Sequence, residues 1–333
     1  GVIDRFQGLW QGSSRLSPQI LGRLKSWVII TSTGASTRIE GSKMTDEEIA
    51  RFLRGLKTKR PSNRDEQEVA GYADLIGRIF DNWKTIKLSE NWILQFHDIL
   101  LRYSDKDQTH RGKYKDSPNA VVMKNERGEQ VVLFDHTPSY LVKPEMEAVI
   151  EWANEQLKSG ETHPLLVIAN FIFEFLAIHP FKDGNGRISR ALTNLLLLQT
   201  GYGYVPYISL DEIIERTRSD YYLALRAAQK SHKTGNEDIT PWANYLLDAL
   251  TEQTERARGI MESDRPEKLL SEKQMKVYRL FDGEQEMGVA EIAVLLKDRV
   301  KRETIKQALS RLVKLRILER LGQTRGSRYK SIK

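Results

Sequence analysis

The sequence predicts a mainly α-helical protein with one β-hairpin and a separate, basic C-terminal domain. Apolar residues recur at helical spacing through most of the chain from residue 45 onward. One stretch, AVVMKNERGEQVVLF at 120–134, instead places two apolar, β-branched runs on either side of a polar turn. The charge balance also changes along the chain. Residues 268–333 hold 17 Lys and Arg against 8 Asp and Glu, whereas 1–267 hold 35 against 37.

The composition excludes several classes of protein. The chain has 333 residues, of which 40% are hydrophobic and 29% charged, as in soluble globular proteins of more than one domain. It contains no Cys, which excludes disulfides, thiolate metal sites and a cysteine nucleophile. The first residues lack the apolar core of a signal peptide, and the most apolar stretch, 165–178, is too short to span a bilayer. We therefore expect a cytoplasmic protein without a membrane partner.

The expected helices follow one another from residue 45 onward. Residues 1–45 are mixed and carry Ser, Thr and Gly clusters. TDEEIARFLRGL at 45–56 predicts a helix capped by Thr45 or Asp46. Further helical patterns occupy 66–80, 89–103, 144–158, 162–177, 188–200, 209–229 and 240–260.

A domain boundary is expected at SDRPEK, 263–268, which carries a proline, several charges and no apolar residue. Beyond it, three short helical patterns and two alternating runs around GQTRGS match the winged helix-turn-helix pattern. We expect three parts: an N-terminal region at 1–59, a helical core at 60–262 and a winged helix domain at 268–333.

The segment HPFKDGNGRISR, 179–190, gathers several chemical groups in one loop. Pro180 should end the preceding apolar helix at His179, a candidate base or nucleophile. Asp183 offers a hard oxygen ligand for Mg²⁺.

The second half of this segment should bind an anion. Its glycines let backbone N–H groups turn toward a ligand at the start of a new helix. Arg187 and Arg190, three residues apart, share one face of that helix and can donate to phosphate oxygens. The combination suits phosphoryl or nucleotidyl transfer, and no Walker A motif is present.

This segment matches the Fic family signature, HxFx[DE]GNGRxxR, at every defined position, and the chain resembles that family across about 60–260. Fic proteins are helical folds with a small β-hairpin flap, and most transfer AMP from ATP to a hydroxyl side chain of a protein. The resemblance implies a protein adenylyltransferase that uses Mg²⁺ and ATP and releases pyrophosphate. Its target would be a Ser, Thr or Tyr of another protein or of itself. It also suggests a homodimer.

The resemblance implies a role for each matching residue. His179 would be the general base and Asp183 the Mg²⁺ ligand. The phosphate-binding residues would be Gly184, Asn185, Gly186, Arg187 and Arg190. The hairpin would hold the target segment by main-chain pairing, through a flap that includes Val121, Val122, Met123, Val131 and Val132. Tyr221 and Tyr222 lie where the family packs adenine and ribose, although a plain pair of core tyrosines explains them equally well.

A second motif lies upstream. Ser36, Glu40 and Gly41 match the family's inhibitory pattern [ST]xxxE[GN], which a helix cap with a surface Glu also produces. The resemblance is to the class with an N-terminal inhibitory helix. It implies that Glu40 pairs with Arg190 and takes the guanidinium that would hold the γ-phosphate. In some relatives the same Glu supports removal of AMP, so de-AMPylation stays an alternative.

The basic C-terminal domain suggests an anionic partner. KRETIKQALSRLVKLR, 301–316, is amphipathic and occupies the position of a recognition helix, followed by a wing. Candidate DNA contacts are Lys301, Arg302, Lys306, Arg311, Arg325 and Arg328. Winged helices also serve as protein-contact modules, so DNA and protein partners both stay open.

Two classes of function compete. One is an autoinhibited adenylyltransferase, and the other is a DNA-binding regulator whose Fic core senses a nucleotide. The intact His179 favours the enzyme, because a sensor needs only the anion site and the arginines. A different donor, such as UTP or a phosphocholine conjugate, is a third alternative, although the GNG loop and the second arginine favour a nucleoside triphosphate.

Overall fold

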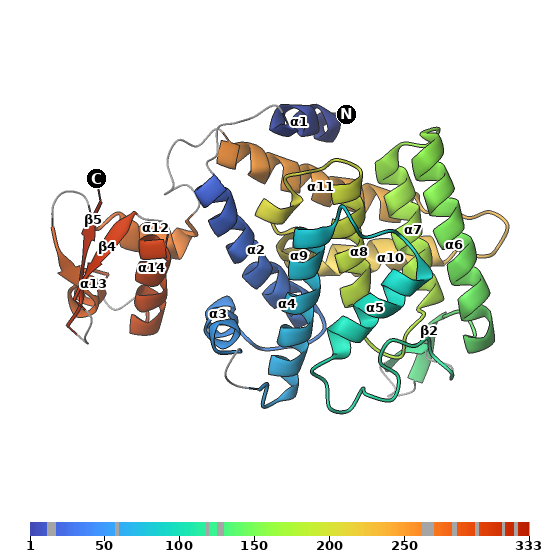
Figure 1. Ribbon diagram of the computed structural model, residues 1–333, viewed down its shortest axis with the longest axis horizontal. Helices are drawn as coiled ribbons and strands as arrows, with labels where there is room; N and C mark the ends of the chain where they lie inside the picture. Colours follow the sequence, from blue (N-terminus) through green and yellow to red (C-terminus); the bar gives the residue numbers. More distant parts are fainter. Residues whose placement is uncertain are drawn as a thin grey trace. The chain divides into compact units, whose positions relative to one another are not determined.

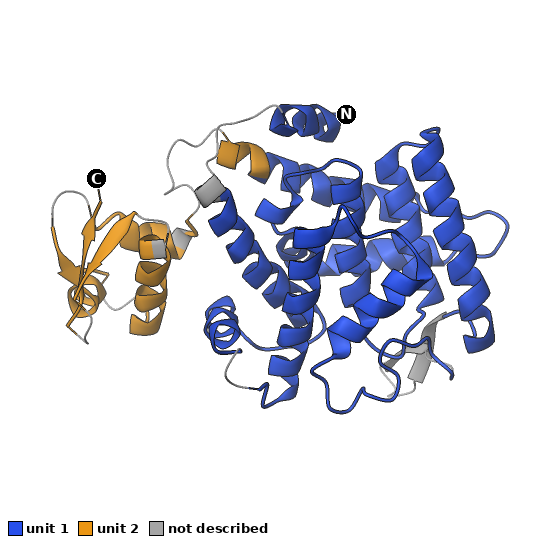
Figure 2. Ribbon diagram, in the orientation of Figure 1, with its two compact units in different colours: residues 1–256 blue, residues 257–333 orange. Residues whose placement is uncertain are grey.

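The computed structural model describes residues 1–11, 18–56, 60–117, 120–124, 130–261, 270–281, 285–296, 300–314, 317–322 and 326–332. The chain divides into two compact units, residues 1–256 and 257–333 (Figure 2). This division lies inside helix α11 (Thr240–Met261). The boundary expected at 263–268 lies entirely outside the described ranges.

Unit 1 is helical except for one hairpin within the described residues (Figure 1), and the predicted mainly α-helical class is confirmed. None of the helices in the described ranges is long and apolar enough to cross a membrane. Its elements are α1 (Val2–Gln11), α2 (Pro18–Ile39), α3 (Asp46–Gly55), α4 (Arg64–Asn82), α5 (Glu90–Leu101), β1 (Ala120–Lys124), β2 (Gln130–Asp135), α6 (Ser139–Ser159), α7 (Pro164–Ile178), α8 (Asn185–Gln199), the short 3₁₀ helix η1 (Val205–Tyr207), α9 (Leu210–Arg216) and α10 (Arg218–Gln229), followed by most of α11.

Helices α7 and α8 form the centre of unit 1, and the loop between them carries the motif. Helix α7 is apolar and buried on almost every face, as expected for a core helix. Helix α8 packs against α2, α4, α5 and α7, and it is buried from Asn185 to Leu198 apart from Gly186, which is half-buried. The residues at 179–190 are therefore held by core elements on both sides.

Helix α2 contains the Ser, Thr and Gly cluster at 31–37, in the region that the sequence pattern left as mixed and where the resemblance implied an inhibitory helix. Its hydroxyl groups bond to carbonyls one turn back: Thr33 Oγ1 donates to Ile29 O over 2.6 Å, and Thr37 Oγ1 to Thr33 O over 2.8 Å. Such residues are weak helix formers. Burial of this face against α4 and α9 overrides that preference.

Three other boundaries differ from expectation. The helix expected at 209–229 breaks at Thr217, whose backbone leaves the helical region and separates α9 from α10. Helix α6 begins five residues before Pro144, which lies inside it. Helix α8 begins at Asn185, so the second half of the motif is already helical.

The predicted hairpin is present as an antiparallel pair of strands. Ala120 pairs with Asp135 and Lys124 with Gln130, with an irregularity between Val121 and Val122. The side chains of both strands, including the five predicted for the flap, lie outside the described part of the chain.

Unit 2 contains a small mixed core. Its further elements are α12 (Glu272–Tyr278), β3 (Met287–Gly288), α13 (Val289–Leu295), α14 (Arg302–Lys314), β4 (Leu318–Leu321) and β5 (Arg328–Ser331). The strands form an antiparallel sheet in the order β3-β5-β4. The helices and the sheet share a core that includes Val277, Phe281, Ile292, Ile305, Leu309, Leu312 and Leu318.

The contact between α4 and α5 predicts a position where only glycine fits. A Cβ atom on Gly71 would lie 1.9 Å from the carbonyl oxygen of Leu100, so the two backbones would have to separate. We expect Gly71→Ala to lower the free energy of unfolding by about 1–3 kcal/mol. Urea titration followed by tryptophan fluorescence reports on unit 1, because all six Trp residues lie within it.

A matched control lies on the same helix. A Cβ on Gly77 would meet only Ile29 Cδ1, at an ordinary 3.9 Å. Gly77→Ala should therefore be neutral or stabilising, by up to about 1 kcal/mol. Equal unfolding midpoints for the two variants would contradict the packing argument.

Candidate active site

His179 lies at the end of α7 in the left-handed backbone region, with a φ of 52°. This conformation is uncommon for a residue with a side chain. Lys115 holds both flanks of the turn: its backbone N–H donates to Pro180 O over 2.9 Å, and its Nζ donates to Ile178 O over 3.2 Å. The imidazole is thus placed by a buried lysine 64 residues earlier in the chain.

The surroundings of His179 disfavour a positive charge. The ring of His136 stacks on it at 4.0 Å, and His136 Nδ1 is 3.1 Å from Ala177 O. Burial, followed by the neighbouring His136 and Lys115, lowers the pKa of His179 to about 3. Burial also lowers the pKa of Lys115 to about 8. His179 is therefore a neutral imidazole at pH 7, the form that can accept a proton.

The loop after His179 is held in place by a buried aromatic ring and by an asparagine side chain. Phe181 is fully buried and stacks on the ring of His97, with centroids 3.9 Å apart. The Asn185 amide bonds to both Phe181 N and Phe181 O, at 2.9 and 2.8 Å, so this side chain braces the loop. His97 Nδ1 accepts from Gly112 N–H, which leaves Nε2–H to donate to Asp183 O over 3.1 Å. Burial lowers the pKa of His97 to about 4.

The N-terminus of α8 has the features that attract an anion. Gly184 is its N-cap, with a φ of +86°, and no side chain caps the first turn. A Cβ on Gly184 would lie 2.7 Å from Leu100 Cδ2. Both this contact and the positive φ disfavour any larger residue at this position. Uncapped N–H groups and the helix dipole attract negative charge.

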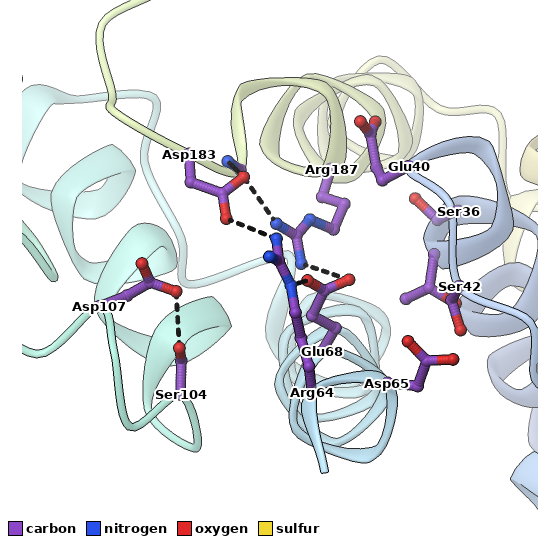
Figure 3. A network of polar contacts seen from close by, with 12 residues as sticks. Ser36, Glu40, Ser42, Arg64, Asp65, Glu68, Ser104, Asp107, Asp183 and Arg187 are labelled. Carbon is purple, nitrogen blue, oxygen red and sulfur yellow. Dashed lines mark hydrogen bonds and ion pairs between the residues drawn. The ribbon is translucent and has the colours of Figure 1, made fainter.

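Arg187 lies on the first turn of α8 and is only 1% exposed. Its Nη2 donates to Asp183 Oδ1 over 3.0 Å, and its Nη1 lies 3.5 Å from Glu68 Oε2 (Figure 3). Within the described residues, Nε and Nη1 have no hydrogen-bond partner. Burial alone would raise the pKa of Asp183, but Arg187, Gly184 N–H and Arg64 together lower it. Asp183 is thus ionised at neutral pH. It lies beside a guanidinium whose Nε–H and Nη1–H groups can still donate hydrogen bonds.

Arg190, one turn further along, contacts both parts of the upstream motif. Its Nε donates to Ser36 Oγ over 2.7 Å, and its Nη2 donates to Ser36 O over 3.0 Å and to Glu40 Oε1 over 2.8 Å. A second carboxylate, that of Asp211, lies 3.6 Å from Nε and accepts a 2.8 Å bond from Tyr72 Oη. The contact expected between Glu40 and Arg190 is present.

Glu40 also lies over the first turn of α8. A Cβ on Gly186 would lie 2.3 Å from Glu40 Oε1, so only glycine admits the carboxylate here. Gly41 follows with a φ of +108°, which lets the chain turn away immediately after Glu40. Helix α2 is anchored just before this turn, because Arg38 donates to Glu215 over 2.6 Å and to Asp46 over 2.9 Å.

The two tyrosines proposed for the nucleobase have different surroundings. Tyr221 is buried and packs edge-on against Trp242 and Tyr245, with centroids 5.3 and 5.7 Å apart. Tyr222 is 38% exposed and lies under the guanidinium of Arg218 at 5.7 Å. Tyr221 is therefore a core residue, and only Tyr222 offers a ring to a ligand.

The predicted basic face of unit 2 is smaller than the sequence suggested. Lys301, Arg302 and Lys306 are exposed at the start of α14. Arg311 was expected on the same outer face but is buried, which corrects that expectation. Arg328 pairs with Glu291 at 3.0 Å, and Arg325 lies outside the described residues. DNA binding stays a prediction with fewer available cations.

Several residues of the site could not be found from the sequence. All of them lie outside the motif, and no spacing relates them to it: Arg64, Glu68, Lys115, His136 and Asp211. Nothing in the sequence near His136 indicates a functional role, yet its ring stacks on that of the candidate base His179. Only the i, i+4 spacing of Arg64 and Glu68 could have indicated a helical ion pair.

The neutral histidines predict how stability depends on pH. The pKa of His97 is about 4 in the folded chain and about 6.5 in an unfolded one. Between these values the unfolded chain binds a proton that the folded chain does not, so the free energy of unfolding falls as the pH falls from 6.5 toward 4. A Gln at this position can accept from Gly112 and donate to Asp183 O. We expect His97→Gln to reduce the slope by up to about 1.4 kcal/mol per pH unit, measured by urea titration with tryptophan fluorescence. An unchanged slope would contradict the assignment.

Comparisons with known proteins agree with this geometry. The family model described as Fic/DOC family matches residues 87–197. Protein adenylyltransferase Fic of Drosophila mojavensis is 37% identical over 109 residues, which are 33% of this chain and 19% of that protein. The Drosophila grimshawi protein of the same name gives the same identity over 20% of its length. The match thus spans about a fifth of these curated relatives.

Solved structures share the fold. A Fic family protein from Desulfovibrio desulfuricans G20 has a TM-score of 0.62 at 22% identity, over 99% of this chain and 93% of that one. Fic-1 (residues 134–508) from C. elegans has a TM-score of 0.63 at 20% identity, over 79% and 72%. The signature loop lies between two core helices, and residues 87–197, which contain it, form a Fic/DOC family domain.

Proposed function

We propose that the chain is a protein adenylyltransferase that transfers AMP from ATP to a hydroxyl side chain and is held inactive by Glu40. The observation that carries this proposal is the loop at 179–190, which sets a neutral imidazole, an ionised carboxylate, an uncapped helix N-terminus and two buried guanidiniums around one region. The names of the curated relatives support the same reaction.

The reaction needs a proton acceptor and charge compensation. The target hydroxyl oxygen attacks the α-phosphorus, its proton passes to the His179 imidazole, and the bond to the β-phosphate oxygen breaks to release pyrophosphate. His179 is neutral before the nucleotide binds. Phosphates near the ring favour its charged form, so the pKa of His179 should rise once ATP is in place. Arg187, Arg190 and the α8 N-terminus would hold the phosphate oxygens.

Asp183 fits a magnesium ion bound together with phosphates. Its carboxylate is ionised and 32% exposed, and no cluster of three His, Asp or Glu that could form an all-protein site exists among the described residues. Mg²⁺ commonly uses one or two carboxylates and completes its shell with substrate phosphates and water. When bound, it would neutralise charge on the phosphates.

Autoinhibition would follow from competition for one anion site. The Glu40 carboxylate bonds to Arg190 and lies over Gly186 on the first turn of α8, where a phosphate would otherwise be attracted. ATP could then bind only without the Arg190 contact.

The hairpin β1–β2 would present the target segment by main-chain pairing.

Removing the Glu40 carboxylate should activate the protein. We expect Glu40→Gly to increase self-modification with Mg²⁺ and ATP at least about tenfold, equivalent to about 1.4 kcal/mol of barrier. Intact-protein mass spectrometry with ATP, UTP, GTP and CTP would identify the donor from the mass added. Glu147→Gln, which removes a carboxylate paired with Lys143 on α6, is the matched control. An unmodified Glu40→Gly protein with every nucleotide would refute the proposal.

His179 should be required for transfer but not for binding. In the Glu40→Gly background, His179→Ala is expected to slow transfer by about 10²–10⁴-fold, the range for loss of a general base. The dissociation constant for Mg·ATP should change little. His163→Asn is the control, because His163 caps the other end of α7 through its side chain and Asn retains an acceptor. Comparable transfer by the His179→Ala protein would remove His179 from this role.

A further inference from the structure

Two residues of α4 join the motif in a closed ring of alternating charges (Figure 3). Glu68 Oε1 accepts from Arg64 Nε over 2.6 Å, and Glu68 Oε2 lies 3.5 Å from Arg187 Nη1. On the other side, Asp183 lies 3.0 Å from Arg187 Nη2 and 3.8 Å from Arg64 Nη2. Arg64 and Glu68 lie one helical turn apart, so α4 presents both to the loop together.

The burial of Arg187 makes its carboxylate partners in this ring important. Arg187 is 1% exposed, and a buried guanidinium needs an anionic partner to stay in place. Glu68 is largely buried, with 11% of its side chain exposed, whereas Asp183 is 32% exposed. Under the proposed function, Asp183 has a second task, because its electron pairs would also serve Mg²⁺. Glu68 is then the carboxylate that stays with Arg187 throughout.

We propose that Glu68 is a positioning residue for the phosphate-binding guanidinium of Arg187, a role that rests on the proposed function. Glu68 acts through Arg187: it holds the Nη1 edge of the guanidinium and so fixes the plane from which the other donors meet a phosphate. Arg64, whose side chain is 61% exposed, orients Glu68 from the solvent side through its 2.6 Å bond. The motif arginine thus depends on a carboxylate 119 residues earlier in the chain.

A double-mutant cycle tests this role. The parent is the Glu40→Gly, His179→Ala protein, which exposes the anion site and stops turnover. In this parent we expect Glu68→Ala to weaken Mg·ATP binding about tenfold by calorimetry, and Glu68→Gln, which keeps an oxygen acceptor, to recover part of the loss. In the Arg187→Ala background, Glu68→Ala should cause no additional loss, because Glu68 acts only through Arg187. For weak binders, the rise in melting temperature with Mg·ATP gives the same comparison.

Asp74→Ala provides the matched control, since Asp74 is another paired carboxylate of α4 and bonds to Arg78 and Arg102 instead. It should bind Mg·ATP like the parent. Equal binding by Glu68→Ala and the parent would overturn the inference, as would an undiminished tenfold loss in the Arg187→Ala background. A parent that binds no Mg·ATP would overturn both this inference and the proposed function. The expected cycle without any transfer by Glu40→Gly would overturn the proposed function alone.

Discussion

Two guanidinium groups buried on successive turns of α8 constrain the rest of unit 1. Arg187 and Arg190 are 1% and 3% exposed, and transfer of such a charge out of water costs several kcal/mol unless carboxylates compensate it. Each has two carboxylate partners: Asp183 and Glu68 for Arg187, Glu40 and Asp211 for Arg190. These partners come from the motif loop, α4, the end of α2 and α9. The helices that surround α8 are therefore joined to it by charge as well as by apolar contact.

The same electrostatics would allow one site to bind both a ligand and its inhibitor, as the proposed function requires. An uncapped helix N-terminus with a guanidinium beside it attracts any anion of suitable size, whether a phosphate or a carboxylate. Glu40 follows α2 directly in the same chain, so its effective concentration at this site is high. Under the proposed function, a nucleotide would have to displace this intramolecular competitor, so the position of Glu40 at the end of α2 would control the site.

The parts of this arrangement that are local in sequence could be predicted, and those that depend on packing could not. The loop at 179–190 was predictable because Pro180, the glycines and the arginine spacing act over a few residues. The helical state of 31–37 could not be predicted from propensity, since burial decides it, and only the family resemblance implied a helix there. Tyr221 and Tyr222 could not be told apart, because neighbours on a helix point about 100° apart and only the surrounding helices determine which one is covered. Glu68 and Asp211 could not be identified from the sequence, because the arginines that they contact are distant in sequence.

The two carboxylates near Arg190 differ in burial, and under the proposed function this difference would make inhibition reversible. The Asp211 side chain is fully buried and braced by Tyr72, whereas that of Glu40 is 32% exposed and precedes a left-handed glycine. Under the proposed function, departure of Glu40 would leave Asp211 3.6 Å from Arg190, so the buried guanidinium would keep one carboxylate partner. The preceding turns of α2 remain anchored, through the 2.8 Å bond between the Ser32 and Ser209 hydroxyls and through the ion pairs of Arg38. Under the proposed function, release of the site would then require a change only around Glu40, directly after α2, while Arg190 would stay in place to bind a phosphate.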